Sequence, residues 1–139
     1  MKKLLLALTI TIVALAASQA QAKTYWHSNL CYVEAWKPIG YPESGSYEIN
    51  GDVGCTLDSS TNIGLQVCPQ KLSGSTWVSA GSCKSANENL GPYPLPNGFS
   101  LGGGYPGVSG TLYRTVSVGC FPVWGGCDYG LEASNSFRF

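Results

Sequence analysis

The chain has 139 residues and carries eight Lys or Arg, eight Asp or Glu and a single His, which gives a formal net charge of zero. Lys2 and Lys3 belong to the leader described next, and removing them leaves six basic against eight acidic residues, a formal charge of −2. Nucleic acids and anionic membranes require clustered Lys and Arg, so this composition argues against both as partners.

The first 22 residues have the three parts of a secretory signal peptide. Met1-Lys2-Lys3 is followed by an apolar run over residues 4–17, and Ala20-Gln21-Ala22 is a small-x-small cleavage pattern. The apolar run is shorter than the roughly 20 residues of a membrane-spanning helix, and no later stretch reaches that length. We expect residues 1–22 to be a bacterial signal peptide. Residues 23–139 are then one domain, secreted or periplasmic, without a membrane span.

The first part of the exported chain predicts two strands and a tight turn. Residues 24–36 are aromatic and β-branched around Leu30-Cys31-Tyr32-Val33, which is typical of a strand. Residues 37–45 hold two Pro and two Gly, so we expect a loop there. A short strand is predicted at Tyr47-Glu48-Ile49. Asn50-Gly51 follows it, and this dipeptide is typical of the type I′ turn of a tight hairpin.

The middle of the chain predicts a half-buried strand. Ile63, Leu65 and Val67 alternate with small or polar residues, a pattern with the period of a strand, and Pro69 is expected to end it. A turn at Ser73-Gly74 then leads into a further strand over residues 76–80.

A long loop is predicted over residues 91–110. This segment is dominated by Gly and Pro, and we expect that it cannot form a regular ladder. Loops of this length inside a compact domain are uncommon and are usually functional or disordered.

The last 29 residues, 111–139, predict a hairpin in which one register explains most of the sequence. In this register the apolar side chains fall on one face, because side chains alternate along a strand. The expected cross-strand pairs on that face are Cys120 with Cys127, Val118 with Tyr129, and Val116 with Leu131. The opposite face holds Gly119, Ser117 and Gly130 and is expected to face water. Residues 121–126 are the predicted connection.

Six Cys lie in the exported part, and an even number in an oxidising compartment predicts three disulfides. There is no C-x-x-C pair and only one His, so a zinc site is the weaker interpretation. We expect neither a metal nor a cofactor. The register above pairs Cys120 with Cys127.

For the other four Cys, shorter loops close more easily. This favours Cys31 with Cys55 and Cys68 with Cys83. A two-residue turn at Ser73-Gly74 places Cys68 and Cys83 about four residues out of register, too far apart to bond. Either the turn lies nearer Ser75-Thr76, or these two Cys have other partners.

Seven or so short strands separated by turn residues, with no segment of helical period, predict an all-β fold. The architecture we expect is a two-sheet antiparallel β-sandwich of Ig-like or Greek-key topology, stabilised by disulfides, with a small β-barrel as the second choice. Tyr113 resembles the tyrosine corner of such sandwiches, but it lies seven residues before Cys120 and not two. No family is assigned on that residue alone.

Groups that could perform catalysis are sparse. His27 is the only imidazole, and the chain has no G-x-S-x-G nucleophile motif. Two pairs of acids could in principle support glycoside hydrolysis, although eight acids spread over the exported chain are better explained as solvated surface. These pairs are Glu34 with Glu48 and Asp128 with Glu132. We therefore expect the protein not to be an enzyme.

Aromatic residues in predicted loops are the candidates for partner binding. They offer large contact area at low entropic cost, although each could instead pack over the end of a small core. The candidates are Trp124, Tyr93, Phe99 and Tyr105. The function expected from them is non-enzymatic binding of an extracellular glycan or protein partner. The alternatives are a secreted antibacterial or toxin-like protein and a small extracellular hydrolase.

Overall fold

The computed structural model describes residues 22–92 and 97–139, and within these ranges the chain forms eleven strands and one short 3-10 helix. In chain order they are β1 (Ala22–Trp26), β2 (Cys31–Ala35), β3 (Ile39–Tyr41), η1 (Pro42–Ser44), β4 (Ser46–Cys55), β5 (Thr61–Ser73), β6 (Thr76–Ser79), β7 (Lys84–Leu90), β8 (Asn97–Pro106), β9 (Leu112–Val123), β10 (Gly126–Ala133) and β11 (Phe137–Arg138). The predicted signal peptide lies outside the described residues, apart from Ala22 in β1.

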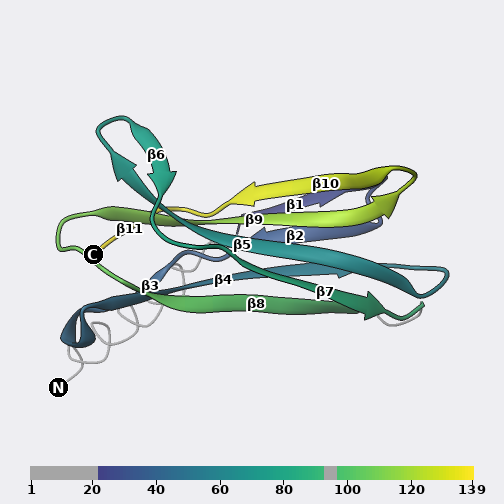
Figure 1. Ribbon diagram of the computed structural model, residues 1–139, viewed down its shortest axis with the longest axis horizontal. Helices are drawn as coiled ribbons and strands as arrows, with labels where there is room; N and C mark the ends of the chain where they lie inside the picture. The colour runs from purple at the N-terminus through teal and green to yellow at the C-terminus, as the bar shows by residue number, and fades with distance from the viewer. Residues whose placement is uncertain (1–21, 93–96) are drawn as a thin grey trace, which may run out of the picture.

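The strands form two antiparallel sheets, and the predicted all-β, two-sheet fold class is confirmed. In the five-stranded sheet, β4 pairs with β8 along one edge and with β2 and β3 along the other, and β1 pairs with β2. In the six-stranded sheet, β5 pairs with β9 on one side and with β6 and β7 on the other. The far side of β9 pairs with β10 and β11. In Figure 1 the sheets are seen face-on, so that strands of the two layers overlap in the view.

The core lies between β4 and β5. Alternate residues of both strands point into it, and they are fully or almost fully buried: Tyr47, Ile49, Val53, Ile63, Leu65 and Val67. The predicted alternation in β5 is thereby confirmed. Each such aliphatic side chain contributes about 1.5–3 kcal/mol relative to its exposed state. No helix among the described residues is long and apolar enough to span a membrane.

The sandwich is partly closed along its edges, where β1 lies against β10 and β7 against β8. Side chains join the first of these edges. The Trp26 indole N–H donates to the Asp128 carbonyl oxygen at 3.1 Å, and His27 Nδ1 lies 2.8 Å from Asp128 Oδ2. Thr24 Oγ1 donates to the Glu132 carboxylate. We call this set of contacts the β1–β10 seam.

The segment predicted as one strand over residues 24–36 is two strands, and the predicted loop over 37–45 holds β3 and η1. The break between β1 and β2 is a tight turn at His27-Ser28-Asn29, whose φ angles are 51°, 56° and 64°. The Leu30 N–H donates to the His27 carbonyl at 3.1 Å and closes this turn. Left-handed backbone is uncommon for residues with a Cβ, so sequence pattern alone did not indicate the break.

The turn predicted at Asn50-Gly51 is wrong, because both residues lie within the continuous strand β4. Gly51 instead allows close approach of the two sheets. A Cβ atom on it would overlap the Ser117 hydroxyl and lie 2.9 Å from a Val67 methyl group. The glycine therefore serves packing between the layers, not turn geometry.

The long loop predicted over residues 91–110 is also wrong, because residues 97–106 form β8 and pair with β4 over ten consecutive positions. Residues 93–96 lie outside the described residues. Phe99 and Tyr105 point inward, in the alternation of a half-buried strand. Gly102 lets the strand lie close to β4, since a Cβ atom there would be 2.6 Å from the Ile49 carbonyl oxygen.

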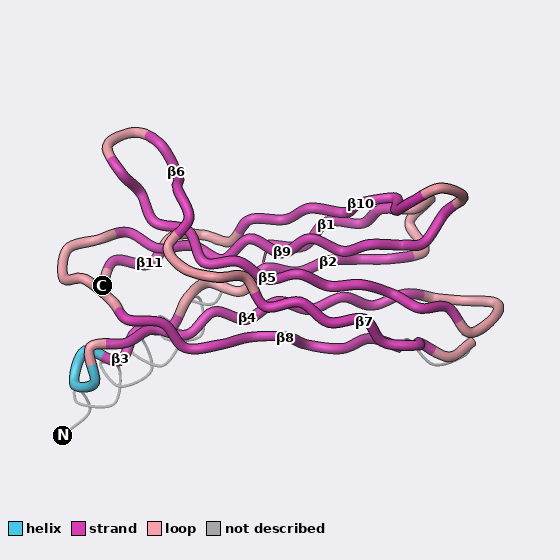
Figure 2. Tube along the Cα trace, viewed as in Figure 1, coloured by secondary structure: helices cyan, strands magenta, loops and turns pink. Residues whose placement is uncertain are grey.

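Strand β5 does not end at Pro69 but continues to Ser73. The Pro69 carbonyl accepts a hydrogen bond from the Ala80 N–H at 3.0 Å. Because the N and O atoms of one residue point to the same side of a strand, the Pro69 nitrogen faces the gap between β6 and β7. No ladder hydrogen bond is lost there. The hairpin of β5 and β6 projects away from both sheets (Figure 2).

The three disulfides join the predicted pairs. The Cα–Cα distances are 4.0 Å for Cys31–Cys55, 4.2 Å for Cys68–Cys83 and 5.3 Å for Cys120–Cys127. The position of the turn between β5 and β6 decides whether Cys68 and Cys83 can bond. This turn lies one residue later than Ser73-Gly74, because Ser73 pairs with Thr76. The chain then leaves β6 and pairs with β5 again as β7, in a register that brings Cys83 beside Cys68. Three disulfides agree with an oxidising extracellular or periplasmic compartment.

The register predicted for the C-terminal hairpin is wrong by two residues, and the face predicted to be buried is the outer one, where only Val116 of the six predicted residues is buried. Cys120 lies opposite Tyr129, and Val118 lies opposite Leu131. The strands run on to a two-residue turn at Trp124-Gly125, where Gly125 has a φ of 82°. Tyr129 and Leu131 are exposed.

The inner face of this hairpin is the small one, because Trp26 of the other sheet covers it. Cβ atoms at Gly119 and Gly130 would both overlap the indole ring of Trp26, which is only 8% exposed. Large side chains at these two positions would have no room.

Tyr113 is buried, and its hydroxyl accepts a hydrogen bond from the Val108 N–H at 3.0 Å, five residues upstream. This bond is of the kind that a tyrosine corner makes. It ties the start of β9 to the connection that precedes it.

Candidate functional site

The outer face of the six-stranded sheet carries the candidate site. Along β10 the outward side chains include Tyr129, which is 66% exposed, and Leu131, which is 61% exposed. Val118 of β9 lies opposite Leu131 and is half-buried. Together with the Cys120–Cys127 disulfide, these side chains form an apolar strip along the hairpin, which we call the hairpin strip.

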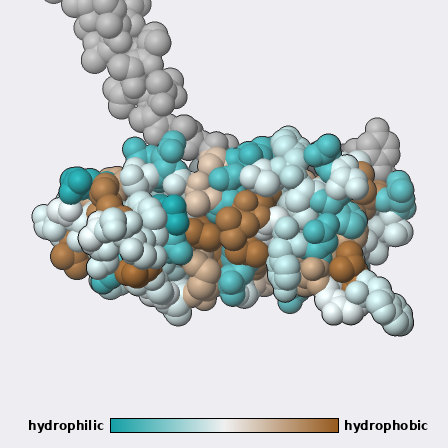
Figure 3. Space-filling view, turned by 90° about the horizontal axis from the view of Figure 1, so that it is seen from above, coloured by the Kyte–Doolittle hydropathy of each residue, from teal (hydrophilic) through white to brown (hydrophobic). Residues whose placement is uncertain are grey.

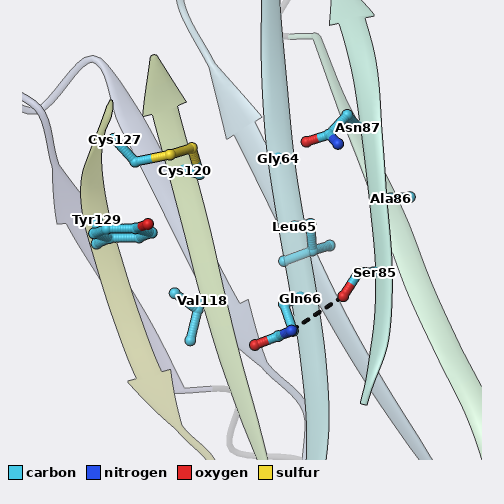
Figure 4. A pocket seen from close by; sticks show the side chains of 10 residues that line it. All are labelled: Gly64, Leu65, Gln66, Ser85, Ala86, Asn87, Val118, Cys120, Cys127 and Tyr129. Atoms are coloured by element: carbon cyan, nitrogen blue, oxygen red, sulfur yellow. Dashed lines mark hydrogen bonds between the residues drawn. A yellow bond between two sulfur atoms is a disulfide. The ribbon is translucent and has the colours of Figure 1, made fainter. Parts of the chain in front are cut away.

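A groove of about 260 Å³ lies beside the hairpin strip. Gly64 of β5 is opposite Cys120 and has no side chain, so the surface is hollowed at this position. The groove is lined by residues of β5, β7, β9 and β10 (Figure 4): Gly64, Leu65, Gln66, Ser85, Ala86, Asn87, Val118, Cys120, Cys127 and Tyr129. Tyr129, Val118 and the disulfide lie on one side of Gly64, and the side chains of β7 lie on the other.

Uncharged polar side chains make the second wall of the groove. The Gln66 amide nitrogen donates to the Ser85 hydroxyl at 3.1 Å, so the two side chains hold each other in place. Asn87 projects from β7 on the same side and makes no side-chain hydrogen bond to another described residue. The groove therefore has one apolar wall and one wall of amide and hydroxyl groups.

No charged residue occupies an outward position in the part of the sheet around the groove, among the residues that the structure describes. The outward residues there are Asn62, Gly64 and Gln66 of β5, Ser85, Asn87 and Asn89 of β7, Val118, Cys120 and Pro122 of β9, and Cys127, Tyr129 and Leu131 of β10. Further along the same face, Arg114 donates to Gln70 at 2.9 Å and stacks on Trp77 at 4.4 Å. Partial burial lowers the pKa of Arg114 from its usual value.

Two further exposed hydrophobic residues lie at the tip of the hairpin. Trp124 is fully exposed, and Val123 beside it is 44% exposed. The predicted position of Trp124 outside the core is thus what the structure shows. Figure 3 views the molecule from the side on which β10 and β6 lie in Figure 1. It shows a hydrophobic patch near the middle of this edge of the sandwich and others near both ends, with hydrophilic residues between them.

Two of the other three predicted binding residues, Phe99 and Tyr105, lie in β8 of the other sheet, apart from Trp124. Tyr93 lies outside the described residues. Tyr105 is in a strand and only 8% exposed, its hydroxyl donates to the Ser82 carbonyl at 2.7 Å, and burial raises its pKa. Phe99 is partly buried and packs against the core. Both residues lie in β8 and not in the loop in which they were expected, and Tyr105 is too buried to be available to a partner. Phe99 lines a shallow depression next to Tyr32 and Asp52.

The outer face of the five-stranded sheet has a different character, because it carries charged groups that already have partners. Lys23 Nζ lies 2.8 Å from the Glu34 carboxylate and 3.8 Å from the centre of the Tyr32 ring. The hydrogen bond to Glu34 raises the pKa of Lys23, and burial raises the pKa of Tyr32. The Trp36 indole N–H donates to Asp52 at 3.0 Å. A shallow depression of about 270 Å³ adjoins Tyr32 and Asp52.

His27 belongs to the β1–β10 seam. Its ring stacks on Phe121 with ring centres 3.6 Å apart, and its Nδ1 faces Asp128. Within residues 22–92 and 97–139, no group of three or more His, Cys, Asp or Glu side chains is arranged to hold a metal ion. The expected absence of a metal remains a prediction for metal analysis.

Sequence reasoning missed the groove for two reasons. It placed Tyr129 and Leu131 inside, and it did not predict β7, whose sequence Lys-Ser-Ala-Asn-Glu-Asn-Leu has little β-propensity. The signal that could have found the groove was the run of small residues at Ser117, Gly119 and Gly130. Such a run on one face of a hairpin indicates that a large side chain from elsewhere covers it.

No protein-family model matches the chain, and no curated protein matches it. The case for a function therefore depends on the geometry of the two outer faces.

Proposed function

We propose that the protein is a secreted, non-enzymatic binding protein that holds an extracellular glycan or protein against the outer face of the six-stranded sheet. One observation carries the proposal. Nine large hydrophobic side chains are exposed in the described residues, and four of them lie on the single hairpin of β9 and β10: Val123, Trp124, Tyr129 and Leu131. Exposed apolar side chains gathered in this way mark interaction surfaces more often than ones scattered singly.

The scaffold under these side chains suits binding. The hairpin is paired along its length, pinned by the Cys120–Cys127 disulfide and joined to β5 on its other side. A side chain held on a rigid element loses little conformational entropy when a partner covers it. Tyr and Trp are also the residue types that supply most binding energy at interfaces.

Binding assays with three matched variants test the proposal. The purified protein and its variants Tyr129→Ala, Trp124→Ala and Tyr25→Ala are screened against immobilised extracellular glycans and proteins. Tyr25 is the control, because it is 57% exposed but lies on the outer face of the other sheet. We expect a partner whose binding falls at least about tenfold with Tyr129→Ala or Trp124→Ala and is unchanged by Tyr25→Ala. A partner that depends on Tyr25 alone contradicts the proposal.

A small extracellular hydrolase is the second candidate, favoured by one observation on the five-stranded sheet. Glu34 and Asp52 lie directly opposite each other on adjacent strands, and Asp52 also lines the shallow depression. Two facing carboxylates are the groups that glycoside hydrolysis uses. Both already have partners, in Lys23 and Trp36, which makes this the weaker candidate. Hydrolysis of an oligosaccharide that Asp52→Asn abolishes, with the fold intact, would establish it.

A further inference from the structure

We infer that the groove beside Tyr129 binds one ring of an uncharged sugar. This inference rests on the proposed binding function and names the chemical class of its partner. It follows from the two unlike walls of the groove, from the absence of charge around it and from its size.

The apolar wall matches the face of a pyranose ring. The C–H groups of such a ring make one of its faces apolar, and an aromatic side chain offers a flat surface for that face. Tyr129 is two-thirds exposed, lies next to Val118 and the disulfide in the lining, and stands on a paired strand. A ring that stacks on Tyr129 would therefore meet a surface that is already in place.

The polar wall matches the hydroxyl groups at the edge of the same ring. A sugar hydroxyl both donates and accepts hydrogen bonds, and a side-chain amide offers both kinds of group. Asn87 supplies an amide with no partner among the described residues. Gln66 is held by Ser85 through its nitrogen, which leaves its oxygen free to accept. Gly64 lies between these amides and Tyr129, so a ring can reach both walls.

The absence of charge selects an uncharged ligand. Phosphate, sulfate and carboxylate groups are bound by Arg, Lys or several backbone N–H groups, and an acidic ligand would find none of these cations around the groove. A basic peptide would find no carboxylate on the outward positions of the four strands that form the groove. Arg114 is on the same face but already contacts Trp77 and Gln70.

The size of the groove fits one ring. A volume of about 260 Å³ corresponds to roughly nine water molecules at about 30 Å³ each, which suits a single ring better than two. Leu131 continues the apolar surface beyond Tyr129 on the same strand, so a neighbouring unit of a glycan chain could lie along the hairpin.

Nuclear magnetic resonance titration of the ¹⁵N-labelled protein tests the inference. The probes are neutral oligosaccharides of glucose, mannose, galactose and N-acetylglucosamine, with an oligosaccharide of galacturonic acid as the charged control. We expect at least one neutral sugar to give saturable shifts in the backbone amides of residues 64–66, 85–87 and 127–131. The side-chain amides of Asn87 and Gln66 should shift in the same titration.

Four variants sharpen the test. Tyr129→Ala and Asn87→Ala remove one group from each wall, and each should weaken the binding at least about tenfold. Tyr129→Phe keeps the ring and should retain most of the affinity, and Tyr25→Ala should leave it unchanged. The amide spectrum of each variant reports whether it is folded. The two walls are tested by separate substitutions, so the failure of one variant to fold does not remove the test.

Three outcomes overturn the sugar inference: no saturable shift with any neutral sugar, shifts confined to other parts of the chain, or binding of the acidic sugar alone. Its failure is distinguishable from failure of the proposed function. A protein partner that is lost with Trp124→Ala, in the absence of any sugar effect, supports the binding function and rejects the sugar. If no partner of either kind responds to the hairpin variants, both proposals fail.

Discussion

The two faces of the β9–β10 hairpin carry different kinds of residue. Each face lies in the environment opposite to the one that its composition predicts. The inner face has Ser117, Gly119 and Gly130 and is buried, whereas the outer face has Tyr129 and Leu131 and is exposed. What decides the burial of a face is the side chain that the other sheet supplies. Here Trp26 fills the space over the two glycines, so the small residues and the large one together make a packed layer.

Removing the Trp26 side chain should have the largest effect on stability. Trp26→Ala leaves the inner face without its cover and deletes the indole hydrogen bond to Asp128. We expect the free energy of unfolding to fall by about 3–5 kcal/mol in a denaturant melt. A loss below about 1 kcal/mol would mean that the indole is not what buries the small face.

Removing the disulfide of the hairpin should have the next largest effect. The double variant Cys120→Ser/Cys127→Ser opens a short loop of six residues, and we expect a loss of about 2–3 kcal/mol in the free energy of unfolding. The wild type melted under reducing conditions is the companion measurement. No change in stability would show that the paired strands alone fix the outer face.

Adding a methyl group to the inner face should lower the free energy of unfolding less than removing Trp26 does. Gly119→Ala places a methyl group against the Trp26 ring, and we expect a loss of about 1–3 kcal/mol from overpacking. Gly126→Ala is the matched control on the same hairpin, because a Cβ atom there meets nothing within 4 Å. Equal effects of the two substitutions would show that backbone propensity, and not the indole, accounts for the loss.

Truncating the exposed Trp124 should have the smallest effect on stability. Trp124 is fully exposed at the turn, so Trp124→Ala should change the free energy of unfolding by less than about 0.5 kcal/mol. Trp124→Ala and Trp26→Ala remove the same residue type from two environments. The difference between their free energies of unfolding therefore measures the effect of burial. A loss of several kcal/mol at Trp124 would place it in a packed contact.

Much of the fold could be predicted from local pattern. The alternation of Ile63, Leu65 and Val67 identified a core strand, and the even number of Cys identified the disulfides. Glycine was the main source of error, because it has two structural uses that the sequence does not separate. Gly125 is needed for its positive φ, whereas Gly51 is needed because another side chain occupies the place of its Cβ.

The candidate site could be predicted only in part, for a related reason. Trp124 lies in a turn, and turn residues are exposed whatever the rest of the chain does. The exposure of Tyr129 instead depends on contacts with a residue more than a hundred positions away, since the choice between the two faces is made by Trp26. Periodicity identified which residues share a face, and it carries no information about which face is covered.

The β1–β10 seam has a consequence for the order in which the protein can fold. Its three hydrogen-bonded contacts join residues separated by 101, 102 and 108 positions in the chain. Contacts of such high separation must wait for loop closure over most of the domain, which slows folding in all-β proteins to milliseconds or seconds. While the chain is being synthesised, β1 can pair with β2 but remains without β10 until that strand has emerged. Until then the indole of Trp26 is exposed to solvent and to any chaperone that recognises apolar side chains.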